Sequence, residues 1–195
     1  MRTLVISASG RKGGTIEKAC KKHASDIQDE AYEYISLFDY RILPCTGCLR
    51  CTKSGNCCLD DDFNTVYEKI LKADHIVLGT PVYCHSVPGS LKTLMDRCCS
   101  KVVPFMDVDT RAKLRDKLAK VREYQERFSK NAPLKGKTFS VITACSTPSK
   151  NNADIKSAFH TIKQFIEEEM KAKITQDIRY TDTLFQFKPL GIEEN

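Results

Sequence analysis

The chain has 195 residues, with 41% hydrophobic and 29% charged side chains, which is typical of a globular protein of one domain. No apolar stretch reaches the roughly 20 residues that cross a membrane. The N-terminus lacks the apolar core of a signal peptide, so we expect a cytoplasmic protein. The net charge is +6, but the Lys and Arg residues are spread along helical segments and alternate with Asp and Glu. This distribution argues against a nucleic-acid or membrane partner.

The first hundred residues alternate between strand and helix patterns. Apolar runs rich in β-branched side chains predict strands, and apolar side chains at helical spacing predict helices. The run at 75–80 is apolar throughout, as expected of a parallel strand that is buried on both faces. The predicted strands are 2–7, 31–38 and 75–80, and the predicted helices open at Thr15, at Asp61 or Asp62, and at residue 88.

The second half continues this alternation after a charged segment. Residues 108–128 have only a thin apolar seam, and we interpret about 104–135 as a helical insertion that forms a surface helix or a subunit contact. The order of the elements predicts a single α/β domain over 1–195, with a parallel sheet and helices on both faces. The elements predicted here are a strand at 137–144, a helix at 152–173 and a weaker strand after it.

The loop after the first strand has the composition of a phosphate site. It reads "SASGRKGGT" over residues 7–15 and ends where a helix begins. Glycines let backbone N–H groups approach an anion, and hydroxyls, the helix N-terminus, Arg11 and Lys12 add attraction. The spacing matches neither GxxxxGK[ST] nor GxGxxG, which argues against a triphosphate or dinucleotide site. A plain glycine-rich turn is the alternative.

Two further loops follow predicted strands, and a parallel sheet brings such loops to one edge. Residues 81–86, "PVYCHS", place a proline, backbone amides and an aromatic ring at a strand end. That combination suits a flat heteroaromatic ligand, although Tyr83 could equally be a core residue. The third loop is 145–151.

These motifs together resemble a known family. "SASGRKGGT", "CTGCLRCTKSGNC", "DDDF", "ADHIVLGTPVY" and "GSLKTLMDR" are similar to the flavodoxin-like NADPH-dependent FMN reductase family, and most of all to its iron-sulfur flavoprotein branch. The resemblance covers about residues 1–100. It implies a flavodoxin-like, doubly wound five-stranded parallel sheet in the order 2-1-3-4-5 with helices on both faces. It also implies FMN as the cofactor and NAD(P)H as a co-substrate.

The resemblance further implies which residues bind the flavin, with the phosphate on the first loop, the isoalloxazine ring on the second and the third loop closing the site. Carried over by motif, the phosphate residues are Ser9, Arg11, Lys12, Gly14 and Thr15 with Ile16 beside them, the ring residues are Pro81, Val82, Tyr83, Cys84, His85 and Ser86, and the closing residues are Cys145 and Ser146. Gly14 departs from the family, which usually has Asn there. No catalytic side chain is predicted, because the cofactors carry the chemistry.

The cysteine-rich loop at 44–60 is a candidate metal site. In a reducing compartment, metal or redox chemistry is the usual explanation for clustered cysteines. The spacing CxxCxxCx5C binds one [4Fe-4S] cluster in the branch that the chain resembles, and we predict the same here. A zinc site and a loop without metal are the alternatives. The predicted ligands are Cys45, Cys48, Cys51 and Cys57, with Cys58 as a substitute for Cys57.

The predicted function is that of an FMN-dependent oxidoreductase or electron-transfer flavoprotein. Electrons would pass from NAD(P)H or another donor, through FMN and the cluster, to a small-molecule or protein redox partner. An exposed cluster loop also favours a homodimer or homotetramer that brings it near a neighbouring flavin. Two alternatives are a cluster-free NAD(P)H-dependent FMN or quinone reductase and a non-enzymatic, flavodoxin-like electron carrier.

Overall fold

The computed structural model describes residues 1–27, 31–102, 132–146, 153–181 and 188–193. The charged helix predicted at 108–128 lies outside these residues and stays a prediction. The described residues form one six-stranded sheet in the order β2-β1-β3-β4-β5-β6. Its strands are β1 (Thr3–Ser7), β2 (Glu33–Ser36), β3 (His75–Pro81), β4 (Thr138–Ala144), β5 (Lys173–Thr181) and β6 (Lys188–Glu193).

Five of these strands are parallel and follow the predicted order 2-1-3-4-5, which confirms the fold prediction. The sixth strand, β6, pairs antiparallel with β5 at the sheet edge and was not predicted. Its sequence, "KPLGIE", contains a proline and a glycine, which weaken any strand pattern.

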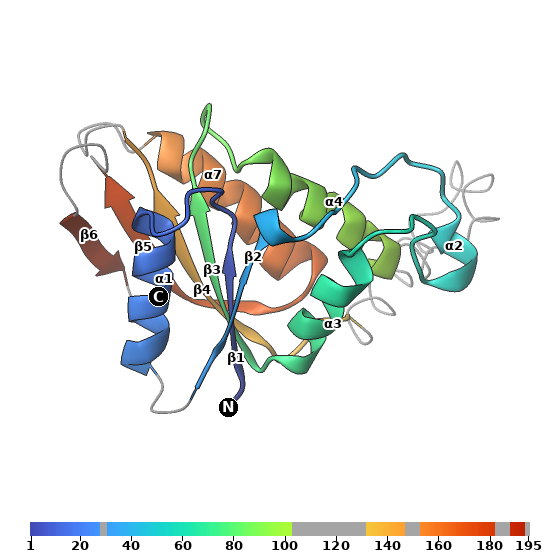
Figure 1. Cartoon of the computed structure of the whole chain (residues 1–195), viewed down its shortest axis with the longest axis horizontal. Coiled ribbons are helices and arrows are strands. Elements are labelled where there is room, and N and C mark those ends of the chain that lie inside the picture. The colour runs from blue at the N-terminus through green and yellow to red at the C-terminus, as the bar shows by residue number, and fades with distance from the viewer. Residues whose placement is uncertain (28–30, 103–131, 147–152, 182–187, 194–195) are drawn as a thin grey trace, which may run out of the picture.

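Helices cover both faces of the sheet (Figure 1). The chain moves one way from β1 to β2 and the other way from β2 to β5, and right-handed crossovers therefore place α1 on one face and α3, α4 and α7 on the other. Of the helices in the described part of the chain, none has the length and apolar character to span a bilayer. The helices are α1 (Thr15–Ile27), α2 (Cys51–Ser54), α3 (Phe63–Lys72), α4 (Gly89–Val102) and α7 (Ala153–Lys163).

Two apolar layers hold the helices to the sheet. The larger layer packs Phe63 of α3, Leu91 of α4 and Ile162 of α7 against one face. The smaller layer packs α1 against the other face, where the side chains of Ile16 and Cys20 are buried. Burial of these side chains, at about 1.5–3 kcal/mol for each large one, fixes where the loops at the strand ends lie.

Two element boundaries differ from the prediction. The strand predicted through Phe38 ends at Ser36, because the Ser36 hydroxyl accepts a hydrogen bond from the Phe38 N–H and starts a short 3-10 helix, η1 (Leu37–Asp39). The helix predicted to residue 173 ends earlier, as α7 continues into a π-helical turn (Gln164–Glu169). Lys171 then takes a left-handed conformation, which leads the chain into β5.

Candidate functional site

The structure brings the three predicted loops to the same edge of the sheet, where β1, β3 and β4 end. The N–H of Ala8, after β1, donates to the carbonyl of Gly79 in β3 at 2.8 Å. The N–H of Val82, after β3, donates to the carbonyl of Ala144 at the end of β4, also at 2.8 Å. The third loop starts at Cys145, the next residue. Adjacent parallel strands thus place all three loops side by side at the point where the strand order reverses.

The first loop presents two cations and backbone donors to solvent. The side chains of Arg11 and Lys12 are exposed, and the Arg11 N–H is held by the Ser9 hydroxyl at 3.3 Å. Gly13 has a φ of 66°, which lets the chain turn into α1 at Thr15. The first N–H groups of a helix have no acceptor inside it, so the start of α1 attracts an anion.

Other backbone donors of the loop are also used, and the Gly14 N–H donates to the Arg11 carbonyl at 3.2 Å. The Gly13 N–H donates to the Glu17 carboxylate at 2.8 Å, and Glu17 also pairs with Lys21 at 2.6 Å. The hydrogen bond from Lys21, together with that from Gly13, lowers the pKa of Glu17. This carboxylate therefore takes up the Gly13 N–H.

The side chain of Arg11 explains the departure at Gly14. A Cβ on Gly14 would lie 3.0 Å from the Arg11 side chain and from the Arg11 carbonyl. Glycine therefore leaves room for the aliphatic part of the Arg11 side chain, in place of the side chain that the family usually has there.

The sequence prediction did not include η1, which packs against the first loop. The Phe38 ring, 58% exposed, packs so near Gly10 that a Cβ there would lie 2.9 Å from it. Asp39 lies 3.7 Å from the Lys12 ammonium. The missed signal was Ser36, a residue type that commonly caps a turn.

The second loop is a tight turn in a strained conformation. The Tyr83 N–H donates to the Ser86 carbonyl at 2.9 Å, and the Ser86 N–H donates back to Tyr83 at 3.0 Å. Between them, Cys84 and His85 have φ angles of 48° and 63°, as in a type I′ turn. Non-glycine residues pay about 1–2 kcal/mol each for this conformation. Such strain gathers at ligand sites, and the Tyr83 ring is 58% exposed beside it.

A hydrogen bond ties the second loop to α7. His85 Nδ1 contacts the carboxylate of Asp154, in the first turn of α7, and the two residues are 69 positions apart in the chain. No local pattern in the sequence connects them, which is why the prediction did not include Asp154.

The predicted flavin residues divide by exposure. The side chains of Ile16, Pro81, Val82 and Cys145 are buried, so their contribution to the edge is backbone. The exposed or half-exposed ones are Ser9, Arg11, Lys12, Gly14, Thr15, Tyr83, Cys84, His85, Ser86 and Ser146. The rest of the third loop lies outside the described residues.

The cysteine loop lies apart from these loops. Figure 1 shows α2 beside the C-terminal half of α4, away from the tip of β3. Helix α4 starts at Gly89, directly after the second loop, and Arg97 stands about 12 Å further along its axis. Within one chain, α4 therefore spans the gap between the aromatic loop and the cysteine loop.

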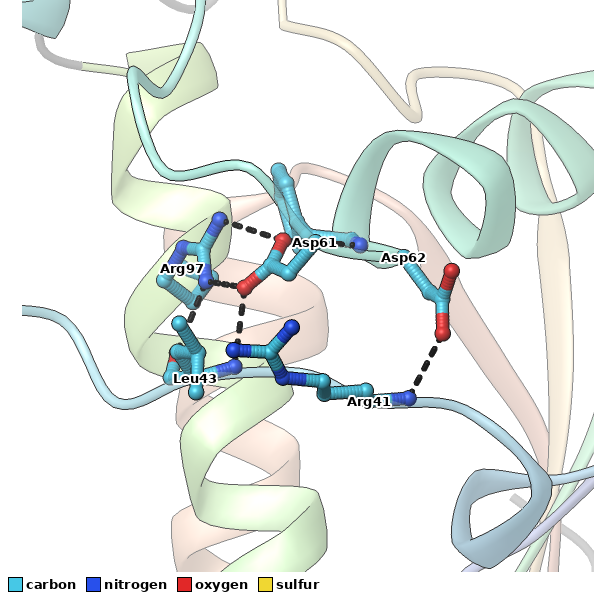
Figure 2. A network of polar contacts seen from close by, with 6 residues as sticks. Arg41, Leu43, Asp61, Asp62 and Arg97 are labelled. Carbon is cyan, nitrogen blue, oxygen red and sulfur yellow. Dashed lines mark hydrogen bonds and ion pairs between the residues drawn. The ribbon is translucent and has the colours of Figure 1, made fainter.

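The two ends of the cysteine loop are clasped together (Figure 2). The buried Asp61 carboxylate accepts from the Leu43 N–H at 2.8 Å and from both Arg97 Nη atoms, and the Arg97 guanidinium also donates to the Leu43 carbonyl at 2.7 Å. Asp62 accepts from the Arg41 N–H at 2.7 Å. The side chains of Arg97 and Asp61 have no exposed surface. This clasp, formed by Arg41, Leu43, Asp61, Asp62 and Arg97, holds the loop closed at its base.

Hydrogen bonds set the charge of the clasp. Burial raises the pKa of Asp61, but the bonds from Arg97, Leu43 and Phe63 outweigh it, so the pKa lies below its usual value. Burial lowers the pKa of Arg97, and the bond to Asp61 outweighs it, with Cys57 adding in the same direction. Both groups are therefore charged at neutral pH, and Arg97 lies close to the Cys57 sulfur.

The cysteines of the loop differ in exposure: Cys51 and Cys57 are half-buried inner thiols, and Cys45, Cys48 and Cys58 are exposed. The pKa of Cys51 is raised by partial burial and then by the charges of Cys57, Cys48 and Cys45, so these four lie near one another. The Sγ atoms of Cys48 and Cys58 lie 3.7 Å apart at the surface. Across the residues that the structure describes, no three His, Cys, Asp or Glu side chains are arranged to hold a metal ion.

Cationic residues on α4 face this loop. Lys101, one turn after Arg97, donates to Asn56 Oδ1 at 2.9 Å, and Asn56 is adjacent to Cys57. Burial lowers the pKa of Lys101, while nearby Cys98, Cys57 and Cys51 act in the opposite direction. Two positive charges on one helix face would stabilise thiolates in the loop.

Comparisons with known proteins agree with the fold and the motifs. The model of the NADPH-dependent FMN reductase family matches residues 1–170. An iron-sulfur flavoprotein of Methanocaldococcus jannaschii is 38% identical over 99 residues, which cover 50% of this chain and 51% of that protein. An iron-sulfur flavoprotein of Archaeoglobus fulgidus is 40% identical over 99 residues, covering 50% and 48%. The chain thus matches about half the length of these relatives.

A solved structure confirms the fold over nearly the whole chain. An NAD(P)H:quinone oxidoreductase from Methanothermobacter marburgensis superposes with a TM-score of 0.64 at 12% identity, covering 93% of this chain and 84% of that one. At this identity the likeness concerns the fold alone. The family model, however, matches most of the chain, including the loops after β1, β3 and β4. The chain belongs to the NADPH-dependent FMN reductase family.

Proposed function

We propose that the chain is an FMN-dependent oxidoreductase that takes electrons from NAD(P)H. The observation that supports this most directly is the meeting of a cationic glycine loop and a strained aromatic loop at the carboxyl edge of the sheet, in a member of this family. When bound, FMN accepts a hydride from NAD(P)H and passes electrons to an acceptor, so the protein supplies binding and orientation.

The residues of each loop have a separate task in this proposal. Arg11, Lys12 and the first amides of α1 hold the phosphate group through charge and backbone donors. The turn at Cys84 and His85 presents backbone groups to the edge of the ring, and Tyr83 covers its border. The hydrogen bond from His85 to Asp154 would fix this turn, so that the loop is in place before the flavin arrives.

Removing the charge of Arg11 tests the phosphate assignment. We expect Arg11→Ala to weaken FMN binding about tenfold, since a charge-assisted bond of about 1.4 kcal/mol is lost. Riboflavin, which has the same ring without the phosphate, should bind as it does to the wild type. Titration of the flavin-free protein with each flavin, followed by fluorescence, measures both affinities.

The matched control is Lys22→Ala, which removes an exposed charge from α1 about two turns after the start of that helix, where Lys22 pairs with Asp26. It should leave the affinity for FMN unchanged. An equal loss for FMN and riboflavin in Arg11→Ala would show that the loop does not hold the phosphate. Anaerobic stopped-flow mixing with NADPH and NADH then separates an enzyme from an electron carrier, whose flavin would stay oxidised with both.

We also propose that the cysteine loop binds a [4Fe-4S] cluster through Cys45, Cys48, Cys51 and Cys57. The support is the cysteine spacing, the nearness of these four thiols to one another and the names of the relatives. When bound, the cluster would carry single electrons. Because the described residues do not form a metal site before binding, the loop would close further around the cluster while its clasped base stays fixed.

The distance between the two loops bears on the assembly. Within one chain, about two turns of α4 separate the aromatic loop from the cysteine loop. We therefore propose a homodimer or homotetramer in which the cysteine loop of one chain approaches the flavin loops of another. The electron acceptor, a small molecule or a protein, would meet the exposed outer side of the loop.

Iron analysis under anaerobic conditions tests the cluster. We expect about four iron and four sulfide per chain in the wild type, and a loss of iron in Cys48→Ser with FMN retained. The matched control is Cys99→Ser, an exposed cysteine of α4 outside the predicted ligand set. A flavin-loaded wild type that contains no iron when prepared without oxygen would rule the cluster out.

A further inference from the structure

The outer cysteines of the loop already touch. Cys48 Sγ and Cys58 Sγ lie 3.7 Å apart, and both residues are exposed. We propose that Cys48 and Cys58 form a reversible disulfide, an oxidation site of this chain that is separate from the flavin loops. A disulfide would bring the two sulfur atoms to about 2.05 Å.

The backbone of the loop holds this pair in place. Gly47 and Leu49, on either side of Cys48, have left-handed φ angles of 66° and 57°, so the chain turns sharply around that cysteine. The other side of the loop is fixed to α4, where Lys101 donates to Asn56. The clasp in Figure 2 closes the base, from Leu43 to Asp61. The contact is therefore part of the closed loop.

The neighbouring cysteine points elsewhere. Cys57 is half-buried, packs against the larger apolar layer and lies beside Arg97. Cys58, the next residue, is exposed and contacts Cys48. This difference places Cys57 with the inner thiols and leaves Cys58 outside them. Cys48 is also a proposed ligand of the cluster. The disulfide and the binding of a cluster by four thiolates therefore exclude each other.

The oxidation balances with a peroxide as the oxidant. Hydrogen peroxide oxidises one thiol to a sulfenic acid, and one water leaves. The second thiol attacks that sulfur, an S–S bond forms, the S–O bond breaks, and a second water leaves. The two thiols give up two electrons and two protons in total. An added dithiol returns both by thiol–disulfide exchange.

Peptide mapping of the full chain tests this inference. The anaerobically isolated protein is treated with hydrogen peroxide, its free thiols are alkylated, and it is digested with trypsin without reduction. Cleavage after Arg41, Arg50, Lys53 and Lys69 separates Cys48, on peptide 42–50, from Cys58, on peptide 54–69. We expect these two peptides to be linked, with fragmentation locating the bond at Cys48 and Cys58, and dithiothreitol to release them.

Serine variants supply the controls. Cys58→Ser should abolish the link, and Cys99→Ser should leave it at the wild-type yield. A bond from Cys48 to another cysteine, or recovery of Cys58 fully alkylated after peroxide treatment, would overturn the proposal.

Iron content keeps this result distinct from the cluster proposal. Cys58→Ser should bind as much iron as the wild type, because Cys57, which lies beside Arg97, is the proposed fourth ligand. Loss of iron in Cys58→Ser with retention in Cys57→Ser would make Cys58 a ligand and overturn the inference. A chain that forms the disulfide but never binds iron would support the inference and contradict only the cluster.

Discussion

Replacing Arg97 with methionine will lower the free energy of unfolding by about 3–5 kcal/mol, the cost of leaving a buried charge without its partner. The side chains of Arg97 and Asp61 have no exposed surface, and Arg97 is the only cation that the described hydrogen bonds give to the Asp61 carboxylate. Urea denaturation at pH 7 measures the loss. Adding Asp61→Asn to Arg97→Met should recover part of it, because a neutral amide can stay buried.

The pH dependence provides a second signature of this pair. In the wild type the pKa of Asp61 is lowered, so its contribution is present above the unfolded value of about 3.8 and is lost as the pH falls below it. Without Arg97, burial raises the pKa of Asp61, and the carboxylate folds best in its protonated form. The variant should therefore lose stability as the pH rises above about 4, opposite in sign to the wild type.

Lys92→Met is the matched control for Arg97→Met. It removes a cation from the same helix, but Lys92 pairs with Asp96 at the surface, where such pairs contribute about 0.5 kcal/mol or less. If both variants lose equally little stability, the clasp is not what holds the cysteine loop closed.

Replacing Gly79 with alanine is expected to cost about 3 kcal/mol by overpacking the layer under α1. An added Cβ would lie 2.1 Å from Cys20 Sγ and 2.8 Å from Ile16 Cγ2, so α1 would have to move off the sheet. Because α1 begins in the phosphate loop, the affinity for FMN should fall together with the stability. Thermal denaturation and flavin titration of the same sample measure the two effects.

A double variant separates overpacking from other effects at this site. Cys20→Ala removes the sulfur that the new methyl group would meet, so Gly79→Ala with Cys20→Ala should be more stable than Gly79→Ala alone, with a coupling of about 1–3 kcal/mol. The control is Gly89→Ala at the start of α4, where an added Cβ meets nothing within 4 Å. Equal stabilities of Gly79→Ala and Gly89→Ala would contradict the close approach of α1 to β3.

Local patterns in the sequence were enough to predict a parallel sheet with helices on both faces, and the resemblance to a family supplied the strand order. The apolar run of β3 and the helical spacing in α1 predict a strand and a helix, since burial alone selects those periodicities. Alternation of the two implies parallel strands, and the carboxyl ends of parallel strands meet at one edge. The positions of the loops after β1, β3 and β4 therefore needed no structure.

Contacts between distant segments could not be predicted in this way. The Arg97–Asp61 pair joins residues 36 positions apart, and the His85–Asp154 pair joins residues 69 apart. Phe38 lies over Gly10 because the second strand ends two residues earlier than its apolar run suggests. Such contacts depend on how helices and loops pack on the sheet, which no single segment encodes.

The cysteine loop illustrates both levels. Its sequence alone determined that several thiols gather between the second strand and the third helix, because the spacing of cysteines in a short loop limits how far apart they can lie. Only the tertiary structure decided that Cys57 turns inward beside Arg97 while Cys58 turns outward to Cys48. Neighbouring residues in a loop have no fixed periodicity, so the direction of each side chain is set by the helix against which the loop is closed.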